Sequence, residues 1–402
     1  MVIKEFETFV VGNPPPRFGG RYFIFVKLVT DTGIVGYGEV YCATFSAETV
    51  EVMLRDTAER FVVGHDPFHI ERLWRRIYGA GYNLRPDVSL VSVLSALEMA
   101  CWDIVGKACN KPVYELLGGK VHERLRSYTY IYPSSGDVYP EPGDTDNVYV
   151  NPDRAAQRAL DYVKQGFTAV KFDPAGPYTI FDGGMPTGQE LDRSEKFTRR
   201  IREAVGPDVD LLFGTHGQFS PAGAIRLAKR LEPYDPLWFE EPTPPENTGA
   251  MARVARATSI PVATGERLCT KYEFARVLED GAASILQLNL GRVGGLLEAK
   301  KIAALAEVHY AQLAPHMYCG PIVGAANIQL ATCSPNFLIL EGIETWGGFQ
   351  AELLNTPVTW EAGYVIPSTE PGLGVSLNEA VARANPWRGD ELHLEMGVEP
   401  VR

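Results

Sequence analysis

The chain contains 402 residues, of which 45% are hydrophobic and 22% charged, a composition typical of a soluble globular protein with two or three domains, or with one barrel and an additional domain. Its 50 acidic and 38 basic residues give a formal net charge of −12. This balance argues against a nucleic-acid or anionic-membrane partner, because both require a basic surface, and an anionic small substrate would need local positive charge or a metal.

Residues 1–122 predict a small α+β unit. Aromatic and β-branched residues on both sides of a turn at 31–33 predict a hairpin formed by Tyr22–Val29 and Ile34–Val40. Apolar residues at helical spacing then predict three helices, at Ala47–Phe61, Phe68–Tyr78 and Val91–Gly106. The most apolar stretch, Ser89–Gly106, is interrupted by Glu98 and Asp103, so no segment reaches the ~18–20 apolar residues of a membrane span.

From Arg126 onward, short apolar runs alternate with amphipathic stretches. This alternation predicts parallel strands, and eight strand-helix units favour a closed barrel over an open sheet. The last helix is missing or displaced, because the chain beyond Ile343 continues as Pro- and Gly-bearing coil. The eight apolar runs are Tyr128–Ile131, Ala169–Phe172, Leu211–Phe213, Leu237–Phe239, Pro261–Ala263, Ile285–Leu288, Ala311–Ala314 and Phe337–Leu340.

The chain therefore divides into three parts. We expect a capping unit in residues 1–122, a barrel in 123–345, and a C-terminal segment in 346–402 that returns to complete the capping unit. A longer loop, Pro133–Asn151, is expected at the surface near the active face.

A polar residue follows nearly every apolar run. In a barrel of this type the carboxyl ends of the strands form the active face, and from the second of these residues onward they are roughly 25 residues apart, about one strand-helix unit. One polar residue at a strand end is usually a solvated loop start, whereas seven in succession indicate a shared site. The seven are Asp173, His216, Glu240, Glu266, Asn289, His316 and Glu341.

Carboxylates that are brought together within such a site repel by ~4 kcal/mol per pair at an effective dielectric constant of about 20. Either one of them stays protonated or a cation lies between them. Mg²⁺ is the natural candidate, because it is a hard ion that takes carboxylate oxygen and keeps water sites open for substrate.

Six motifs are spread over nearly the whole chain. They are GYGEV (Gly36–Val40), ALEMACWDIVGKACNKPVYELLGG (Ala96–Gly119), WFEEP (Trp238–Pro242), ATGER (Ala263–Arg267), APH (Ala314–His316) and PGLGV (Pro371–Val375). Together they resemble the enolase superfamily in its mandelate racemase/muconate lactonizing enzyme branch, and within it the sugar-acid dehydratases of galactonate or mannonate type. The resemblance implies an α/β fold: a modified (β/α)7β TIM barrel with an N-terminal α+β capping domain that the C-terminal tail completes.

The resemblance also implies Mg²⁺ bound by three strand-end acids and abstraction of the proton α to a carboxylate. Enzymes of this superfamily use a Lys or His side chain as the base for that step. By position, Glu240 and Glu266 fall on the second and third metal ligands, and His316 falls on the base. Glu341 falls on the group that hydrogen-bonds the enolate oxygen, and His216 on the general acid for the leaving hydroxide.

The first departure from the family pattern is Gly214, which stands where the family has an aspartate as its first metal ligand, two residues before the histidine. The ion must lose that ligand or take another from Asp173 or His216. Asp173 could instead be a base, or a carboxylate paired with Lys171.

The second departure is Asn289, which replaces the aspartate that orients and charges the base histidine. An amide can accept a hydrogen bond from the ring and fix its tautomer, but it cannot stabilise imidazolium by charge. We therefore expect His316 to be a weaker base than its relatives and, depending on geometry, to act mainly as an acid.

Substrate contacts are expected from the loop Asn13–Tyr22, which resembles the family's mobile loop, and from the segment that begins at Tyr41. Arg17 or Arg21 would neutralise the carboxylate of an anionic substrate, and Lys171 lies at the second strand end. Closure of the loop would exclude water and strengthen the electrostatic interactions inside.

These observations predict an Mg²⁺-dependent dehydratase that converts an aldonate or aldarate into a 2-keto-3-deoxy acid. The alternatives are a racemase, epimerase or cycloisomerase of the same superfamily, or a sugar-acid binding protein that has lost catalysis. We expect a cytoplasmic protein, because the six cysteines show no CxxC pairing and charged residues interrupt the first ten positions, where a signal peptide would be apolar. The resemblance to the family implies a homo-oligomer.

Overall fold

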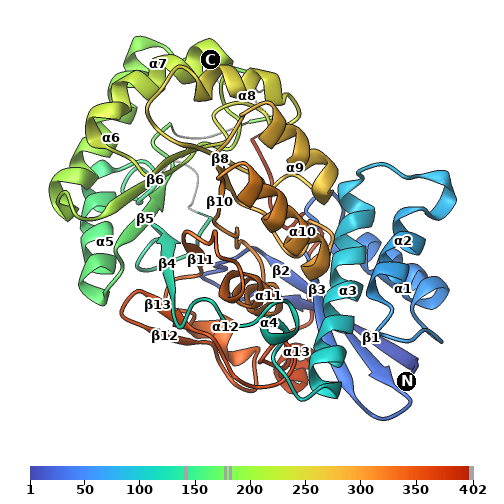
Figure 1. Ribbon diagram of the computed structural model, residues 1–402. Coiled ribbons are helices and arrows are strands. Elements are labelled where there is room, and N and C mark those ends of the chain that lie inside the picture. Colours follow the sequence, from blue (N-terminus) through green and yellow to red (C-terminus); the bar gives the residue numbers. More distant parts are fainter. Residues whose placement is uncertain (140–143, 176–178, 181–182, 398–402) are drawn as a thin grey trace.

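The computed structural model describes residues 1–139, 144–175, 179–180 and 183–397, so residues 140–143 of the predicted loop Pro133–Asn151 lie outside the described part of the chain. The N-terminal unit is an antiparallel sheet of β1 (Ile3–Gly12), β2 (Tyr22–Thr30) and β3 (Val35–Val40), in that order. Helices α1 (Ala47–Phe61), α2 (Ile70–Tyr78) and α3 (Val88–Ala108) cover it (Figure 1).

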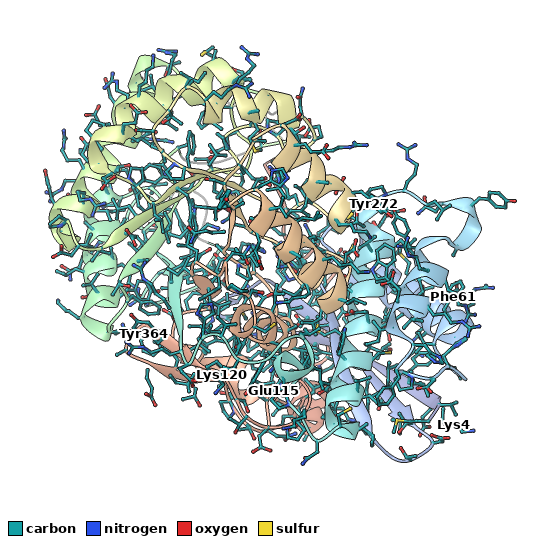
Figure 2. The ribbon with its side chains drawn as sticks, viewed as in Figure 1. Lys4, Phe61, Glu115, Lys120, Tyr272 and Tyr364 are labelled. Carbon is teal, nitrogen blue, oxygen red and sulfur yellow. The ribbon has the colours of Figure 1, made fainter. Side chains whose placement is uncertain are left out.

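The predicted hairpin is confirmed as β2 and β3, but the sequence analysis missed β1. Alternate residues of this strand, Phe9 and Val11 among them, are buried, whereas Lys4 and Glu5 are exposed. Figure 2 shows the side chain of Lys4 projecting from the outer edge of the sheet. The charges that argued against a signal peptide are thus the solvent side of a half-buried strand.

Helix α3 lies between the N-terminal sheet and the barrel. In the described part of the chain it is the one helix that is long and apolar enough to cross a membrane, but 78% of its apolar window is buried, as in the core helix of a soluble domain. Gly38 of β3 lets the helix approach closely, since a Cβ there would lie 1.9 Å from the carbonyl oxygen of Ala96. Glu98 and Asp103 accept hydrogen bonds from the backbone of Leu296 and Leu373, at 2.8 and 2.9 Å.

The middle of the chain forms a closed barrel of eight parallel strands, as predicted. The last strand pairs with the first, with Glu341 opposite Tyr128. An isolated bridge between Leu313 and Phe337 joins the seventh strand to the segment that leads into the eighth. The strands are β4 (Leu125–Tyr130), β5 (Ala169–Phe172), β6 (Asp210–Gly214), β7 (Trp238–Glu240), β8 (Val262–Thr264), β9 (Ile285–Leu286), β10 (Gln312–Leu313) and β11 (Leu340–Gly342).

One main helix lies between each pair of successive barrel strands, and none of this kind follows β11 in the described residues, so the (β/α)7β architecture is confirmed. These helices are α5 (Pro152–Gln165), α6 (Gly188–Val205), α7 (Pro221–Leu231), α8 (Thr248–Ala255), α9 (Thr270–Glu279), α10 (Gly295–Val308) and α11 (Pro321–Thr332). The short elements are η1 (Ala80–Tyr82), α4 (Val113–Leu116), η2 (Glu232–Tyr234) and α12 (Gly348–Glu352).

The C-terminal segment serves both parts of the molecule. Its hairpin of β12 (Thr359–Glu361) and β13 (Tyr364–Ile366) pairs antiparallel with the start of β4. It then reaches the N-terminal sheet, where α13 (Glu379–Ala384) packs beside β1 and the backbone of Trp387 donates to Val10 at 3.0 Å. The tail therefore completes the capping domain, while the boundaries 1–122, 123–345 and 346–402 remain predictions.

Glu39 of the GYGEV motif fastens the capping domain to the barrel. Its side chain is fully buried and accepts hydrogen bonds from the backbone of Gly320 and of Val323, the latter at 2.9 Å, where α11 begins. Burial raises the pKa of Glu39 to about 8, against the opposing effect of these N–H groups. The two hydrogen bonds satisfy backbone donors at the start of α11 that have no partner within the helix.

Glu39→Ala should lower the free energy of unfolding by about 2–4 kcal/mol, because it leaves two backbone donors unpaired in a buried interface at roughly 1–3 kcal/mol each. Urea unfolding followed by tryptophan fluorescence measures this loss. Glu59→Ala, at an exposed position of α1, is the matched control and should change stability by less than about 0.5 kcal/mol. Equal losses in the two variants would contradict the anchoring role.

Candidate active site

A cavity of about 550 Å³ lies at the carboxyl end of the barrel strands, a size that suits a small organic ligand. Its wall contains Lys171 and five of the seven predicted strand-end residues, namely Asp173, His216, Glu266, His316 and Glu341. The convergence that the residue spacing predicted is therefore present in the structure. Asn289 and Glu240 lie directly behind this wall, hydrogen-bonded to residues of the wall.

His216 reaches the cavity because the chain turns sharply after β6. Its backbone has φ 49°, in the left-handed region. Hydrogen bonds hold the turn on both sides: Thr215 Oγ1 donates to the carbonyl of Glu240 at 2.7 Å, and Gly217 N donates to the carbonyl of Glu241 at 2.7 Å. The polar turn that follows the buried run Leu211–Phe213 is thus hydrogen-bonded to the end of the next strand. These bonds hold the imidazole of His216 toward the cavity.

His216, Glu240 and Glu266 together form a candidate metal site. Each offers one ligand atom, and these atoms lie within 4.8 Å of one another. Glu240 is fully buried, and its other contacts are Lys171 Nζ at 2.8 Å and Gln287 Nε2 at 2.6 Å. Burial raises the pKa of Glu240, so this carboxylate depends on its neighbours for charge compensation.

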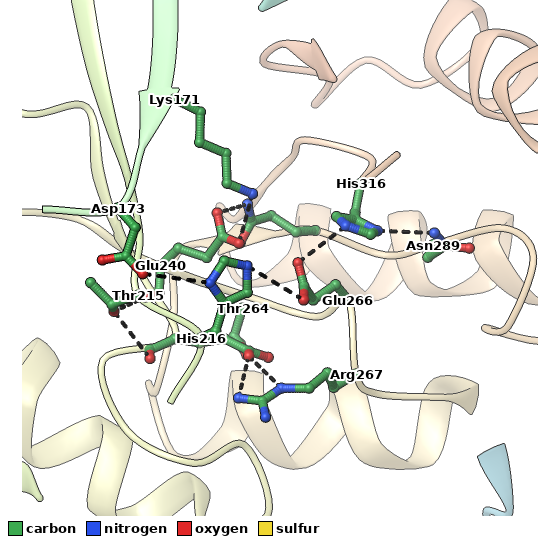
Figure 3. A network of polar contacts seen from close by, with 12 residues as sticks. Lys171, Asp173, Thr215, His216, Glu240, Thr264, Glu266, Arg267, Asn289 and His316 are labelled. Carbon is green, nitrogen blue, oxygen red and sulfur yellow. Dashed lines mark hydrogen bonds and ion pairs between the residues drawn. The ribbon is translucent and has the colours of Figure 1, made fainter. Parts of the chain in front are cut away.

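Glu266 is the electrostatic centre of the group. Its carboxylate lies 3.2 Å from His316 Nε2 and 4.0 Å from His216 Nε2 (Figure 3). Burial would raise the pKa of Glu266, but His316, His216 and Lys171 hold it below its usual range. Glu266 is therefore ionised at neutral pH.

Lys171 occupies the space that the missing family aspartate would need. A Cβ at Gly214 would lie 2.7 Å from Lys171 Cε, so glycine at this position gives the lysine its path. Lys171 Nζ ends 2.8 Å from Glu240 and 3.4 Å from Glu341. Burial alone would lower the pKa of Lys171, but these two carboxylates raise it well above its usual value, so it is an ammonium group.

Asp173 does not pair with its strand neighbour Lys171, as one reading of the sequence had it, because the ammonium is directed to Glu240 and Glu341. Instead, Asp173 Oδ2 lies 4.0 Å from His216 Nδ1, and Oδ1 accepts a hydrogen bond from the backbone of Ala175 at 2.8 Å. Asp173 is also outside the group of possible metal ligands. Of the two replacements considered for the missing ligand, the geometry thus favours His216.

The amide of Asn289 faces His316 with its nitrogen. The backbone of Gly291 donates to Asn289 Oδ1 at 2.8 Å, and this leaves Asn289 Nδ2 to donate to His316 Nδ1 at 2.9 Å. The expectation that Asn289 accepts a hydrogen bond from the ring is therefore wrong, because the amide nitrogen, and not the oxygen, faces His316 Nδ1. A neutral His316 then carries its proton on Nε2, the nitrogen beside Glu266.

Two carboxylates complete the surroundings. Glu341 accepts hydrogen bonds from the backbone of Met317 at 2.8 Å and from Lys171, and burial raises its pKa. Glu241 pairs with Arg267 at 2.6 Å and is not among the three candidate ligands. Glu341 therefore remains available to a ligand in the cavity, whereas Glu241 stiffens the rim.

The predicted substrate residues separate into two groups. Tyr41 and Lys171 line the cavity, whereas Arg17 and Arg21 are absent from its described wall. Arg17 pairs with Asp137, and the guanidinium of Arg21 lies over the ring of Tyr139 at 4.2 Å. The loop that carries both arginines is thus held by the segment that follows β4.

Sequence reasoning missed two kinds of residue at this site. Gln287, which binds Glu240, is a polar residue between two leucines in the β9 region, and that interruption was the available signal. Leu394 and Glu395 line the cavity from the C-terminal tail, where no periodic pattern points to a site.

Comparisons with known proteins agree with this geometry. Residues 18–118 match the family described as mandelate racemase/muconate lactonizing enzyme, N-terminal domain, and residues 154–381 match the family described as enolase C-terminal domain-like. A D-galactonate dehydratase of Ralstonia pickettii (strain 12J) is 36% identical over 387 residues, which cover 93% of this chain and 94% of the relative. A D-gluconate dehydratase of Thermoproteus tenax is 33% identical over 401 residues, 99% of this chain and 76% of the relative. A solved structure from Labrenzia alexandrii DFL-11, assigned to the mandelate racemase/muconate lactonizing enzyme group, is 67% identical, covers 100% of both chains and has a TM-score of 0.96.

In the metal-free protein at pH 7, ¹⁵N NMR of the histidine rings should find His316 neutral and protonated on Nε2. Burial lowers the pKa of His316 from 6.5 to about 4, so the stability that its neutral ring contributes is present above pH 6.5 and lost as the pH falls through about 4. Asn289→Asp provides an acceptor for the ring and should move the proton to Nδ1. The signals are assigned with His316→Asn, and a ring already protonated on Nδ1 in the unchanged protein would contradict the assignment.

Proposed function

Because the chain belongs to the mandelate racemase/muconate lactonizing enzyme family of the enolase superfamily, we propose that it is a hydro-lyase that removes water from a sugar acid. The observation that carries this proposal is one cavity in which a group of metal-type ligands lies between two proton-transfer side chains, Asp173 and His316. The relatives named D-galactonate and D-gluconate dehydratase support the substrate class.

The donor set of His216, Glu240 and Glu266 fits a divalent cation, and we assign it to Mg²⁺. Two ionised or ionisable carboxylates and an imidazole are suitable ligands, and their buried charges call for a cation. The three ligand atoms lie within 4.8 Å of one another, close enough that side-chain rotation would bring all three to a single cation. When bound, the ion would polarise the substrate carboxylate and stabilise the negative charge that develops on it.

We assign proton transfer to Asp173 and His316, which are joined through a row of contacts that passes by His216 and Glu266 (Figure 3). Asp173 accepts the proton α to the substrate carboxylate as the C–H bond breaks. His316, which becomes an imidazolium by taking a proton from solvent as negative charge develops on the substrate, then transfers its Nε2 proton to the β-hydroxyl. The hydroxyl leaves as water, and the ring returns to its neutral form. The enol that remains tautomerises: C3 takes up a proton and the C2 hydroxyl loses one, which gives the 2-keto-3-deoxy acid, and Asp173 releases its proton to solvent.

Lys171 and Glu341 act on the carboxylate end of the substrate. Lys171 Nζ is an ammonium at the cavity wall, and burial raises the pKa of Glu341, so this carboxyl group holds a proton more readily than an exposed glutamate does. Both therefore favour the extra negative charge that forms when the α-proton leaves. In this assignment His316 is an acid, and His216 is a ligand, in place of the base and acid roles that the resemblance implied.

A screen of aldonates and aldarates with added Mg²⁺ should give a keto-deoxy acid from at least one compound, detected as the semicarbazone. Chelator should abolish the product, and fresh Mg²⁺ should restore it. His316→Asn should lower kcat by at least about 100-fold, because general acid catalysis contributes roughly 10²–10⁴-fold. Exchange of the α-proton with solvent deuterium without loss of water would instead indicate a racemase or epimerase, and tight binding without metal or exchange would indicate a binding protein.

The variants His216→Asn and Asp173→Asn test whether His216 is the metal ligand and Asp173 the base that accepts the α-proton. His216→Asn should weaken Mn²⁺ or Mg²⁺ binding by at least about 100-fold, whereas Asp173→Asn, which alters only a neighbour of the ligand, should weaken it by about 10-fold or less. Asp173→Asn should nevertheless abolish α-proton exchange. Isothermal titration calorimetry and NMR in D₂O provide the two readouts, and equal losses of metal affinity would contradict the assignment.

A further inference from the structure

The C-terminal tail crosses the mouth of the active-site cavity. Residues 392–397, here called the tail segment, contact both the capping domain and the barrel. Arg21 Nη1 donates to the carbonyl of Leu392 at 2.9 Å, and Tyr139 Oη donates to the carbonyl of His393 at 3.3 Å. At its far end, Gly397 accepts a hydrogen bond from the backbone of Ile180, in the loop after β5, at 2.9 Å. The tail segment is thus held from both sides of the mouth.

His393 docks the tail segment into the capping domain. Its side chain is 4% exposed, and its ring meets the rings of Tyr22 and Tyr41 edge-on, with centroids 5.3 Å apart in each pair. Gly20 makes room for it, since a Cβ there would lie 2.1 Å from the imidazole. Tyr41 itself lines the cavity, so the docking of His393 is continuous with the cavity wall.

The two residues after His393 become part of that wall. Leu394 and Glu395 both line the cavity, and Glu395 Oε2 lies 3.6 Å from Arg21 Nη2. The carboxylate is about half exposed, at 47%, and so faces the entrance. A carboxylate from the tail therefore forms part of the cavity wall and is paired with Arg21.

The charges along the cavity differ between its two ends. Among the described lining residues, the one lysine or arginine is Lys171, and it lies at the metal end beside Glu240 and Glu341. The entrance instead carries the acids Asp144 and Glu395 among tyrosine and valine side chains. A substrate carboxylate is thus favoured at the metal end, whereas a second one would meet negative charge at the entrance.

We propose that the tail segment forms one wall of the substrate site and that Glu395 is a specificity-determining residue, which selects acids with a single carboxylate over those with a carboxylate at each end. This inference rests on the proposed function for the identity of the ligand as a sugar acid. It goes further in naming aldonates over aldarates, and in assigning the selection to a residue near the C-terminus.

The test compares an aldonate and an aldarate of the same hydroxyl configuration on the complete, Mg²⁺-loaded protein. The unchanged protein should have the higher kcat/KM with the aldonate. Glu395→Gln removes the opposing charge and frees Arg21, so kcat/KM for the aldarate should rise by about 10-fold, through KM, while the value for the aldonate changes by less than about 2-fold. Glu391→Gln, which removes an exposed acid from the same tail, is the matched control and should change neither value.

Calorimetric binding of both acids to the same variants separates this inference from the proposed function. If neither acid is dehydrated but Glu395→Gln improves aldarate binding alone, the tail assignment stands and the proposed activity fails. If the aldonate is dehydrated and Glu395→Gln affects both acids equally, the tail assignment fails alone. A preference of the unchanged protein for the aldarate, or binding of neither acid, also overturns the inference.

Discussion

The constraint on which the site depends is the burial of three carboxylates, Glu240, Glu266 and Glu341, at one end of a closed barrel. Each pair would repel by ~4 kcal/mol at 4 Å and an effective dielectric constant of about 20. Lys171 compensates two of them directly, and the histidines His216 and His316 flank the third. A divalent cation among these ligands would complete the compensation and supply the Lewis acidity that a carbon acid needs in order to ionise.

The capping domain matters because it fixes the walls around this charge. Buried acids on β3 and α3, namely Glu39, Glu98 and Asp103, accept backbone hydrogen bonds from the starts of α11 and α10 and from the PGLGV turn. Such bonds hold the cap in one position over the barrel without placing further charge in the cavity. The tail then uses the same surface, through His393 and Arg21, to bring residues from the end of the chain to the entrance.

Much of this could be predicted from the sequence, because strand-helix alternation and regular spacing are local signals. These signals predicted the barrel and the convergence of the strand-end residues on one rim, which the structure has for Asp173, His216, Glu266 and His316. What they could not give depends on contacts between distant residues. The orientation of the Asn289 amide is set by Gly291 and reverses its expected role, and the direction of Lys171 depends on the absence of a side chain at Gly214. The strand β1 and the tail segment lack the periodicity on which prediction relies.

The central claim is that His216 has replaced an aspartate as the third protein ligand of a catalytic cation. Anomalous diffraction from a crystal soaked in Mn²⁺ tests it most directly. We predict one strong peak within about 2.0–2.3 Å of the His216 imidazole and of one carboxylate oxygen each from Glu240 and Glu266. A cation bound by Asp173 with His216 turned away, or Glu240 and Glu266 without any peak between them at saturating Mn²⁺, would contradict the account.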